Sequence, residues 1–457
     1  MVSRFGVAVL RGLRLPFSLL LRARLRLIDL AVELLALFVA NVAAVASRGC
    51  RRRRVAEGNP RLVWGSTPLV NNVYWSRAMR EAGWNSRTFV THFYSISSRG
   101  DFDDVLGEMY SWCPSRYRPY LGFIRSISCD DVVFTSFNGF MVQSSRLGRS
   151  QAAIFRRAGI KTVVMPFGSD AYVYSRIRSV GTVQGLLLSY PQAAREQDRI
   201  AGAVDYWCRN ADVVIPGVMG MDGMGRWDVP LPSALSLDLG QWSTKQSYGG
   251  GDGRRGSVTI CHAPNHRGFK GTEFVIDAIA QLQAEGLDVE LLLIEGRPNE
   301  EVRRILRDEA DVLVEQLIFT GHGINGLEGM ASGLPVVCNL EDEQYLLPAR
   351  RYAFFGECPL VSADPESLVD VLRELVTRPD LRETLGRMGR QYVEKYHGLD
   401  SSRHLFGAVL DYLYGRRETL SDLYHPLTSD YVKRSPRIEP PLDKNRLRLA
   451  KGDTERR

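Results

Sequence analysis

Apolar runs of four to six residues alternate with longer amphipathic stretches through most of the chain. Runs of this length, rich in Val, Ile and Leu, are typical of parallel strands that are covered on both faces. They lie at residues 62–65, 88–91, 131–135, 161–165, 212–216, 258–261, 289–294, 312–317 and 334–338. The spacing between them predicts helices over 72–82, closed by Gly83, and over 272–284, closed by Gly286.

This alternation predicts an α/β protein of two Rossmann-like, doubly wound domains. A stretch at 245–257, KQSYGGGDGRRGS, mixes glycine with polar residues and is typical of a flexible linker. It separates predicted domains at 61–244 and 258–398, followed by a closing helix within 399–415 and a polar tail over 416–457. Ligands of such folds bind beyond the carboxyl ends of the strands, so we expect the site in a central cleft between the two sheets.

The first sixty residues have a different character. They hold 11 Arg and 3 acidic residues, whereas the whole chain has a formal charge of only +7. Residues 27–47 are long enough to cross a bilayer but contain Asp29, Glu33 and Asn41. At 100° per residue, Arg22, Arg26, Asp29 and Glu33 share one helix face. We predict a basic, membrane-anchoring helix over 1–60, and leave open an in-plane anchor, a single span or a helix packed on the protein.

Composition and charge exclude several classes of protein. A 44% hydrophobic, 24% charged chain is neither disordered nor a multi-pass membrane protein. Between the basic ends the net charge is negative, which disfavours a nucleic-acid partner. The seven cysteines form no C-x-x-C pair, and the histidines at 92, 397, 404 and 425 lack metal-ligand spacing, so we expect no metal, no disulfide framework and a reducing cytoplasm.

The first candidate motif is HAPNHRGFKGTEF, residues 262–274. A strand ends, a loop carries Arg267 and Lys270, and Gly271 with Thr272 opens a helix. Helix N-terminal amides, a glycine and two cations suit a diphosphate. The alternative is a solvated loop with surface cations.

The second motif is TGHGINGLEGMASGLPVV, residues 320–337, with glycines at 321, 323 and 326. It follows an apolar run and precedes a helix, as dinucleotide-binding loops do. We expect Glu328 in the first helical turn, where its carboxylate can accept hydrogen bonds from both hydroxyls of a ribose. The alternative is an acid that only complements the helix dipole.

In this order and at this separation, the two motifs resemble the donor domain of glycosyltransferases of the GT-B architecture, family 4 in particular. The similarity continues through 360–397, and more loosely through FRRAGIKTVVMPFGSD at 155–170 and RNADVVIPG at 209–217. The resemblance, over about residues 61–415, implies a retaining, metal-independent hexosyltransferase with a nucleotide-diphosphate sugar as donor and no cofactor. Arg267 and Lys270 would stabilise the leaving diphosphate, and the donor contacts would be Gly271, Thr272, His322, Gly323, Gly326 and Glu328.

The acceptor side rests on polar residues after strands of the first domain, namely Asn71, Asn72, Ser169 and Asp170. The chain also departs from the family: Thr320 stands where a first glutamate is common, His322 replaces an aromatic residue, and a first-domain histidine is missing. The expected partners are a nucleotide sugar, a glycan, lipid-linked or small-molecule acceptor, and the anionic cytosolic membrane face. The alternatives are an inactive relative that binds nucleotide sugars or acts as a scaffold, and an epimerase or phosphorylase on the same fold.

Overall fold

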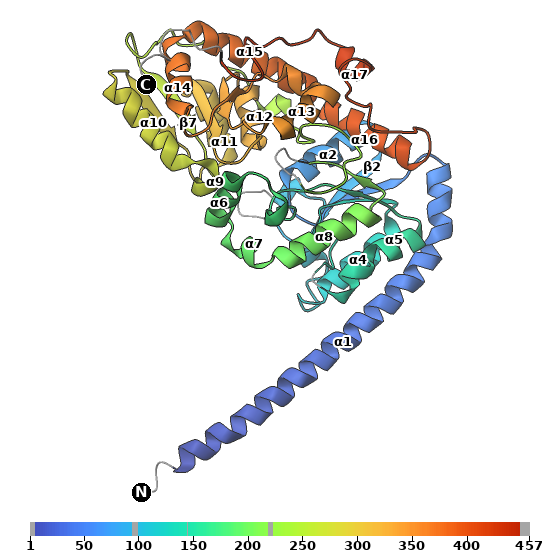
Figure 1. Cartoon of the computed structure of the whole chain (residues 1–457). Helices are drawn as coiled ribbons and strands as arrows, with labels where there is room; N and C mark the ends of the chain where they lie inside the picture. The colour runs from blue at the N-terminus through green and yellow to red at the C-terminus, as the bar shows by residue number, and fades with distance from the viewer. Residues whose placement is uncertain (1–4, 94–98, 144, 218–222, 448–457) are drawn as a thin grey trace.

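The structure is a computed structural model that describes residues 5–93, 99–143, 145–217 and 223–447, with side chains described from residue 24. It contains two parallel sheets in separate lobes (Figure 1). The six strands of the first sheet run in the order β3-β2-β1-β4-β5-β6, the Rossmann order. Their bounds are β1 Arg61–Trp64, β2 Asn85–Val90, β3 Asp104–Val105, β4 Val132–Thr135, β5 Lys161–Val164 and β6 Val213–Val214.

The second sheet has five strands in the order β11-β10-β9-β7-β8, which is the other common doubly wound order. Its strands are β7 Val258–His262, β8 Val289–Leu293, β9 Val312–Gln316, β10 Val336–Cys338 and β11 Val361–Ser362. Two doubly wound domains are therefore present, as the sequence predicts. Strands β3 and β11, of two residues each, have no counterpart among the predicted runs.

Helices cover both sheets (Figure 1). The helices up to the linker are α1 Phe5–Ala56, α2 Val70–Glu81, α3 Leu106–Met109, α4 Arg118–Cys129, α5 Gln151–Ala158, α6 Val180–Ser189, α7 Pro191–Arg195 and α8 Gln197–Asn210. The remaining helices are α9 Arg267–Lys270, α10 Thr272–Ala284, α11 Asn299–Asp308, α12 Ile324–Ala331, α13 Glu343–Tyr352, α14 Leu368–Thr377, α15 Pro379–Tyr396, α16 Leu399–Leu413 and α17 Asp430–Lys433.

Helix α16 returns from the second lobe to cover the first. The Phe406 ring lies 4.7 Å from that of Trp64 on β1 and 5.6 Å from that of Trp75 on α2. These contacts are buried, and one hydrophobic cluster continues through both lobes. The two carboxyl edges are therefore held in a fixed relation to each other.

Two segments make contacts that the sequence does not suggest. The 245–257 stretch has no helix or strand, yet the Tyr248 hydroxyl donates to the Gly333 carbonyl at 2.7 Å and the Arg382 guanidinium donates to the carbonyls of Gly249 and Gly251. The buried Arg382 and the partly exposed Tyr248 thus bind this backbone to the second lobe, and the flexibility of the linker stays a prediction. The predicted polar tail also packs, up to residue 447, through buried apolar residues and through Asn445, whose amide donates to the Cys358 and Leu360 carbonyls.

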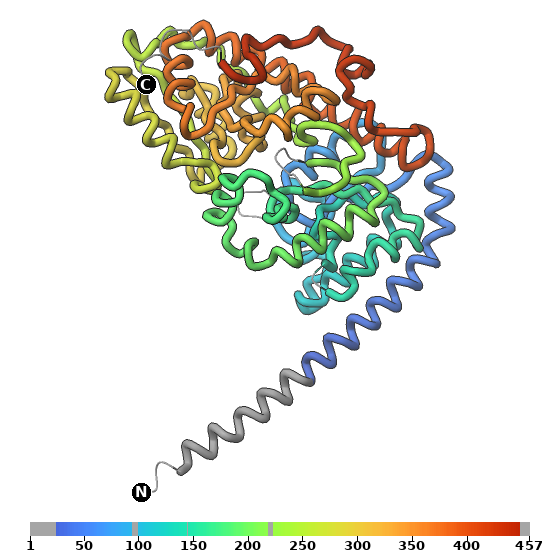
Figure 2. Tube along the Cα trace, viewed as in Figure 1, coloured from blue at the N-terminus to red at the C-terminus, as the bar shows by residue number. Residues whose placement is uncertain are grey.

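Helix α1 docks along α4 and α5 of the first lobe (Figure 2). Small residues, Ala36, Ala40 and Ala44, are buried in this contact. The Tyr117 hydroxyl donates to Asp29 at 2.7 Å, and the Tyr120 hydroxyl donates to Glu33 at 3.0 Å. The two acids of the predicted charged stripe therefore face the protein, whereas Arg26 of the same stripe is exposed. The side chain of Arg22, also assigned to this stripe, is outside the described residues.

Arg51 is the deepest link between α1 and the lobe. It is 2% exposed, and its guanidinium donates to the carbonyls of Ile127, Asp130 and Ala158 and pairs with Asp131 at 3.1 Å. A buried charge is stable only when it is paired and hydrogen-bonded, and Arg51 meets both conditions.

The opposite face of α1 is apolar and uncovered. The exposed fraction is 67% for Leu27 and Phe38, 58% for Leu34, 52% for Val42 and 65% for Val45. The Arg24–Ala56 part is long and apolar enough to cross a membrane, and an 18-residue window within it has a mean hydropathy of 2.1. We call Leu27, Leu34, Phe38, Val42 and Val45 the outer stripe.

Candidate functional site

Each sheet has a topological switch point, between β1 and β4 in the first and between β7 and β9 in the second. At such points the neighbouring connections leave in opposite directions and open a crevice at the carboxyl edge. The chain places most of its predicted site residues at these two edges. The two differ in how their polar groups are bonded.

Lys270 lies at the second switch point, at the end of the short helix α9. It is 7% exposed, and its ammonium donates to Glu315 and, at 2.8 Å, to Gln316. Gly271 follows with φ 76°, a left-handed conformation that lets α10 begin at once in a new direction. Lys270 is therefore an interior cation rather than a solvated one.

Glu315 and Gln316 are consecutive on β9, yet both contact Lys270. On a regular strand such neighbours point to opposite faces. The pairing with β10 explains the difference: Val337 faces Val314 and Cys338 faces Gln316, so Glu315 is the extra residue of a β-bulge. Gln316 also donates to the Gly321 carbonyl at 2.6 Å, which fixes the glycine loop.

His262 fixes the start of α10. Its Nδ1 lies 2.7 Å from the Val314 carbonyl and its Nε2 lies 2.9 Å from the Thr272 hydroxyl. Burial lowers the pKa of His262 to about 4, so the ring is neutral. A neutral ring donates to the carbonyl through Nδ1 and accepts from Thr272 through Nε2. Thr272 is thus bonded to His262, and the helix terminus beside Lys270 is rigid.

Gly323 lies directly over the Lys270–Glu315 pair. A Cβ atom at Gly323 would be 3.3 Å from Glu315 Oε1 and 3.8 Å from Lys270 Nζ, so glycine leaves an approach to the ammonium that a larger residue would narrow. A Cβ at Gly326 would be 3.2 Å from the His322 Cβ. His322 is fully buried, its pKa is lowered by burial, and its Nε2 has no partner among the described residues.

Glu328 is the fifth residue of α12, in the second turn. The expectation of a first-turn acid is wrong, because the helix begins at Ile324, after the loop glycines. Glu328 is partly exposed, and Asn325 donates to it at 3.4 Å. Burial raises the pKa of Glu328 to about 7, against the opposing effects of Asn325, Arg303 and Lys270.

Glu328 faces the first lobe. Burial, followed by the charge of Glu328, raises the pKa of Tyr74 on α2 to about 12. The carboxylate is thus near enough to Tyr74 on α2 and Arg303 on α11 for their pKa values and its own to be linked by charge.

The Arg267 side chain forms its ion pairs with residues outside this site. It is 42% exposed and pairs with Glu273 at 2.9 Å and Glu295 at 3.2 Å. Thr320, where the family resemblance would place a glutamate, lies 3.4 Å from Asn339 Oδ1.

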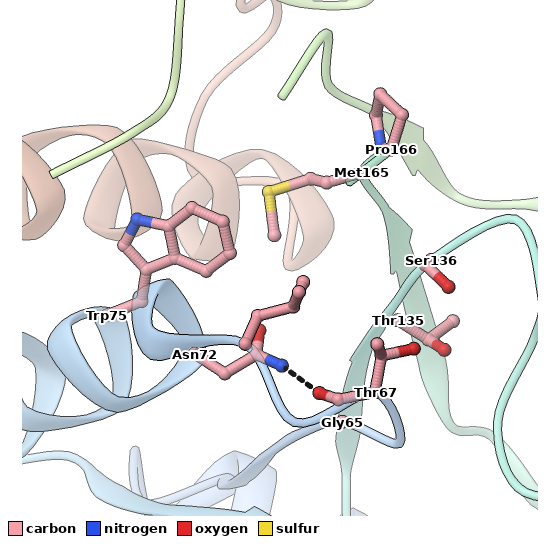
Figure 3. A pocket seen from close by; sticks show the side chains of 9 residues that line it. Gly65, Thr67, Asn72, Trp75, Thr135, Ser136, Met165 and Pro166 are labelled. Atoms are coloured by element: carbon pink, nitrogen blue, oxygen red, sulfur yellow. Dashed lines mark hydrogen bonds between the residues drawn. The ribbon is translucent and has the colours of Figure 1, made fainter. Parts of the chain in front are cut away.

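The edge of the first sheet encloses a small pocket at its own switch point (Figure 3). Its volume is about 10 Å³, at the lower limit for one water molecule. Asn72 lines it, but its amide donates to the Thr67 carbonyl at 2.9 Å. Asn71 faces elsewhere and accepts from the Ser236 amide at 2.8 Å.

Asp170 is buried near this edge, and its carboxylate accepts from the backbone amides of Phe137, Phe167 and Gly168, each at 3.0 Å. Burial raises its pKa to about 7 although these bonds lower it. Asp170 therefore joins the loops after β4 and β5, and Ser169 beside it is partly exposed.

The residues that the sequence analysis missed are Glu315, Gln316 and His262. One feature could have revealed Glu315 and Gln316: VLVEQ places an acid and an amide at the end of an otherwise apolar strand. Within the described part of the chain, no group of three or more His, Cys, Asp or Glu side chains could hold a metal ion.

A search with the sequence finds no matching family model and no matching curated protein. Solved structures are similar in fold. S. aureus MnaA, in a co-structure with UDP, is 11% identical and covers 78% of this chain and 97% of its own, with a TM-score of 0.44. WaaG, a glycosyltransferase involved in lipopolysaccharide biosynthesis, is 15% identical over 78% and 99% with a TM-score of 0.39, and Acinetobacter baumannii MurG is 12% identical over 78% and 100% with a TM-score of 0.37. At these values none of them assigns a function to this chain.

Proposed function

We propose that this protein is a retaining, metal-independent glycosyltransferase that moves a sugar from a nucleotide-diphosphate sugar to a glycan, lipid-linked or small-molecule acceptor. Lys270 would bind the diphosphate and stabilise its charge as it leaves, beside the N-terminus of α10. Gly323 would pass under the donor, and Glu328 would accept hydrogen bonds from the ribose hydroxyls. Arg267 would join the diphosphate only by leaving Glu273 and Glu295.

One observation carries this proposal: a buried lysine, a helix N-terminus and a glycine loop meet at the switch point of the second sheet. A buried ammonium beside an open glycine is suited to an anionic oxygen. Glu328, partly exposed on α12, adds a hydrogen-bond acceptor after the glycine loop. This combination fits a nucleoside diphosphate better than a neutral ligand.

The first experiment is a thermal-shift screen of UDP, GDP, ADP and their sugar conjugates. A ligand at 100 times its dissociation constant adds about 2.7 kcal/mol to the free energy of unfolding. We expect one nucleoside diphosphate and its sugar to stabilise the protein, and release of that diphosphate to require an acceptor. Release with water alone would favour an epimerase or phosphorylase, and no shift with any nucleotide would contradict the proposal.

A second candidate is a relative that binds nucleotide sugars without turnover. The favouring observation is that both predicted cations already have carboxylate partners, Lys270 with Glu315 and Arg267 with Glu273. Saturable binding of the donor with no product from any acceptor would select this candidate.

We propose further that the outer stripe of α1 binds the anionic cytosolic face of the membrane. The docked face carries Asp29, Glu33 and Arg51 against the protein, so the helix would lie in the membrane plane and not cross it. The stripe is apolar, and exposed arginines such as Arg24 and Arg48 flank it. Each basic side chain near an anionic surface contributes about 1 kcal/mol.

Vesicle sedimentation tests this proposed membrane contact. The experiment uses the full chain, because α1 is part of the fold of the first lobe. Leu34→Glu with Phe38→Glu should abolish binding to vesicles of phosphatidylcholine and phosphatidylglycerol. The matched control is Leu427→Glu, 73% exposed in the C-terminal segment, which should bind as the native chain does. Equal binding of all three proteins would contradict the proposal, and a salt-resistant dimer without vesicles would mean that the stripe binds a second copy.

A further inference from the structure

The Lys270 ammonium is held by two neighbouring residues that a regular strand would separate. The bulge at Glu315 turns both Glu315 and Gln316 toward Nζ. An ammonium has three N–H donors. Among the described residues no oxygen or nitrogen binds the third donor of Lys270.

Gly323 lies close to this ammonium, and the Phe269 ring centroid is 5.9 Å from Nζ. A Cβ at Gly323 would be 3.8 Å from Nζ, and glycine has none. An oxygen of an anionic ligand approaching past Gly323 would come close to an ammonium that is held by two hydrogen bonds, with Glu315 Oε1 also near the opening, 3.3 Å from the same Cβ position. Side-chain rotation, which usually makes lysine an imprecise donor, is removed here.

Glu315 also has hydrogen-bonding capacity that its contacts with described residues leave unfilled. Its side chain is fully buried, and its Oε2 has no partner among the described residues. Buried polar atoms in folded proteins are nearly always bonded, so an unbonded carboxylate oxygen beside a candidate site calls for an explanation. A carboxylate retained for stability alone would be expected to use both oxygens.

We propose that Glu315, supported by Gln316, is a positioning residue for the proposed sugar transfer: it holds Lys270 so that one N–H donor points at the donor diphosphate. This inference rests on the proposed function of the same site. Glu315 neutralises the charge of Lys270, so the pair attracts a diphosphate weakly in the ground state. Its advantage is the fixed direction of the donor when charge develops on the leaving diphosphate, which is the condition for electrostatic catalysis.

The test separates binding from turnover. In Glu315→Gln the pair gains a net positive charge while Lys270 loses its charged support. We expect the dissociation constant for UDP, or for the nucleoside diphosphate found in the screen, to stay equal or fall, and kcat to fall at least about tenfold. Glu315→Asp, which keeps the charge, should recover part of kcat. The matched control is Glu290→Gln, an exposed glutamate on β8, which should change neither quantity.

If Glu315→Gln does not fold, Glu315→Asp alone carries the test, because it keeps the buried carboxylate and the Gln316 bonds to the glycine loop while shortening the reach of the support to Lys270. It should lower kcat at least about fivefold with UDP affinity within about threefold of native. A native-like kcat in Glu315→Gln, or an equal loss of UDP affinity and kcat, would overturn the positioning role while leaving the proposed function in place. A native chain that binds no nucleoside diphosphate would overturn both.

Discussion

The two sheet edges use polar residues in opposite ways. At the first edge, the polar side chains are hydrogen-bonded to backbone groups of neighbouring loops, as Asn71, Asn72 and Asp170 show. At the second edge, charged side chains bond to one another, and Glu315 and His322 each keep a buried atom that no described residue binds. The first edge also has one buried atom without a partner among the described residues, Thr135 Oγ1, but that atom belongs to a neutral hydroxyl. Unused bonding capacity on a buried charged group, the Glu315 carboxylate, therefore distinguishes the second edge from the first.

Among the substitutions that test this contrast, Lys270→Ala is expected to have the largest effect. We expect turnover to fall about 10² to 10³-fold, because a cation is removed from developing negative charge. The free energy of unfolding should also fall by about 3 to 5 kcal/mol, because Glu315 would remain as a buried unpaired charge. Steady-state kinetics and urea unfolding measure the two effects. Lys270→Met combined with Glu315→Gln should recover stability but not turnover, and full activity in either variant would place the diphosphate elsewhere.

Asp170→Asn probes the other edge. One amide replaces a carboxylate that accepts three backbone N–H bonds, so we expect a loss of about 1 to 3 kcal/mol in the free energy of unfolding. Donor affinity and kcat of the folded fraction should be unchanged. A selective rise in the KM for acceptor, at native stability, would instead support the acceptor-binding role that the sequence predicts for Asp170.

A smaller effect is expected from pH at the second edge. Burial raises the pKa of Glu328 to about 7, and only the ionised form accepts from both ribose hydroxyls. At pH 6 about one tenth of Glu328 is ionised and at pH 8 about nine tenths, so donor affinity should rise up to about tenfold over this interval. Calorimetric titration measures it. Glu328→Gln should bind about tenfold more weakly at pH 8 and show a flat profile, and a pH dependence kept in the variant would assign the titration to another group.

The smallest expected effect concerns the stability of the free protein. The folded pKa of Glu328 exceeds its ordinary value of 4.5, so folding favours the protonated acid. Its contribution to stability is complete below pH 4.5 and is lost as pH rises through about 7. Glu328→Gln should therefore raise the Tm relative to native at pH 8 and change it little at pH 4.5. A gain that is equal at both pH values would show that packing, not ionisation, is responsible.

The sequence predicts the elements well where the pattern is local. Helix α10 begins and ends as expected, and Gly83 and Gly286 adopt the positive φ of helix ends. The runs at 62–65 and 161–165 become strands because continuous apolar stretches need cover on both faces.

What the sequence misses depends on contacts between distant residues. Nothing near Lys270 in the chain shows that Glu315, 45 residues later, is its partner. The bulge on β9 depends on the register with β10, which a single strand does not specify. On α1 the spacing correctly places Asp29 and Glu33 on one face, but only the positions of Tyr117 and Tyr120 show that this face is the buried one.

The burial of Arg51 also has an evolutionary consequence. A terminal segment attached through a flexible linker can be gained or lost by recombination without harm to the neighbouring domain. Arg51 excludes this for α1, because loss of the helix would leave Asp131 and three backbone carbonyls of the first lobe without their buried donor. Selection is therefore expected to keep helix and lobe together as one unit, whereas substitutions along the outer stripe would leave these buried contacts intact.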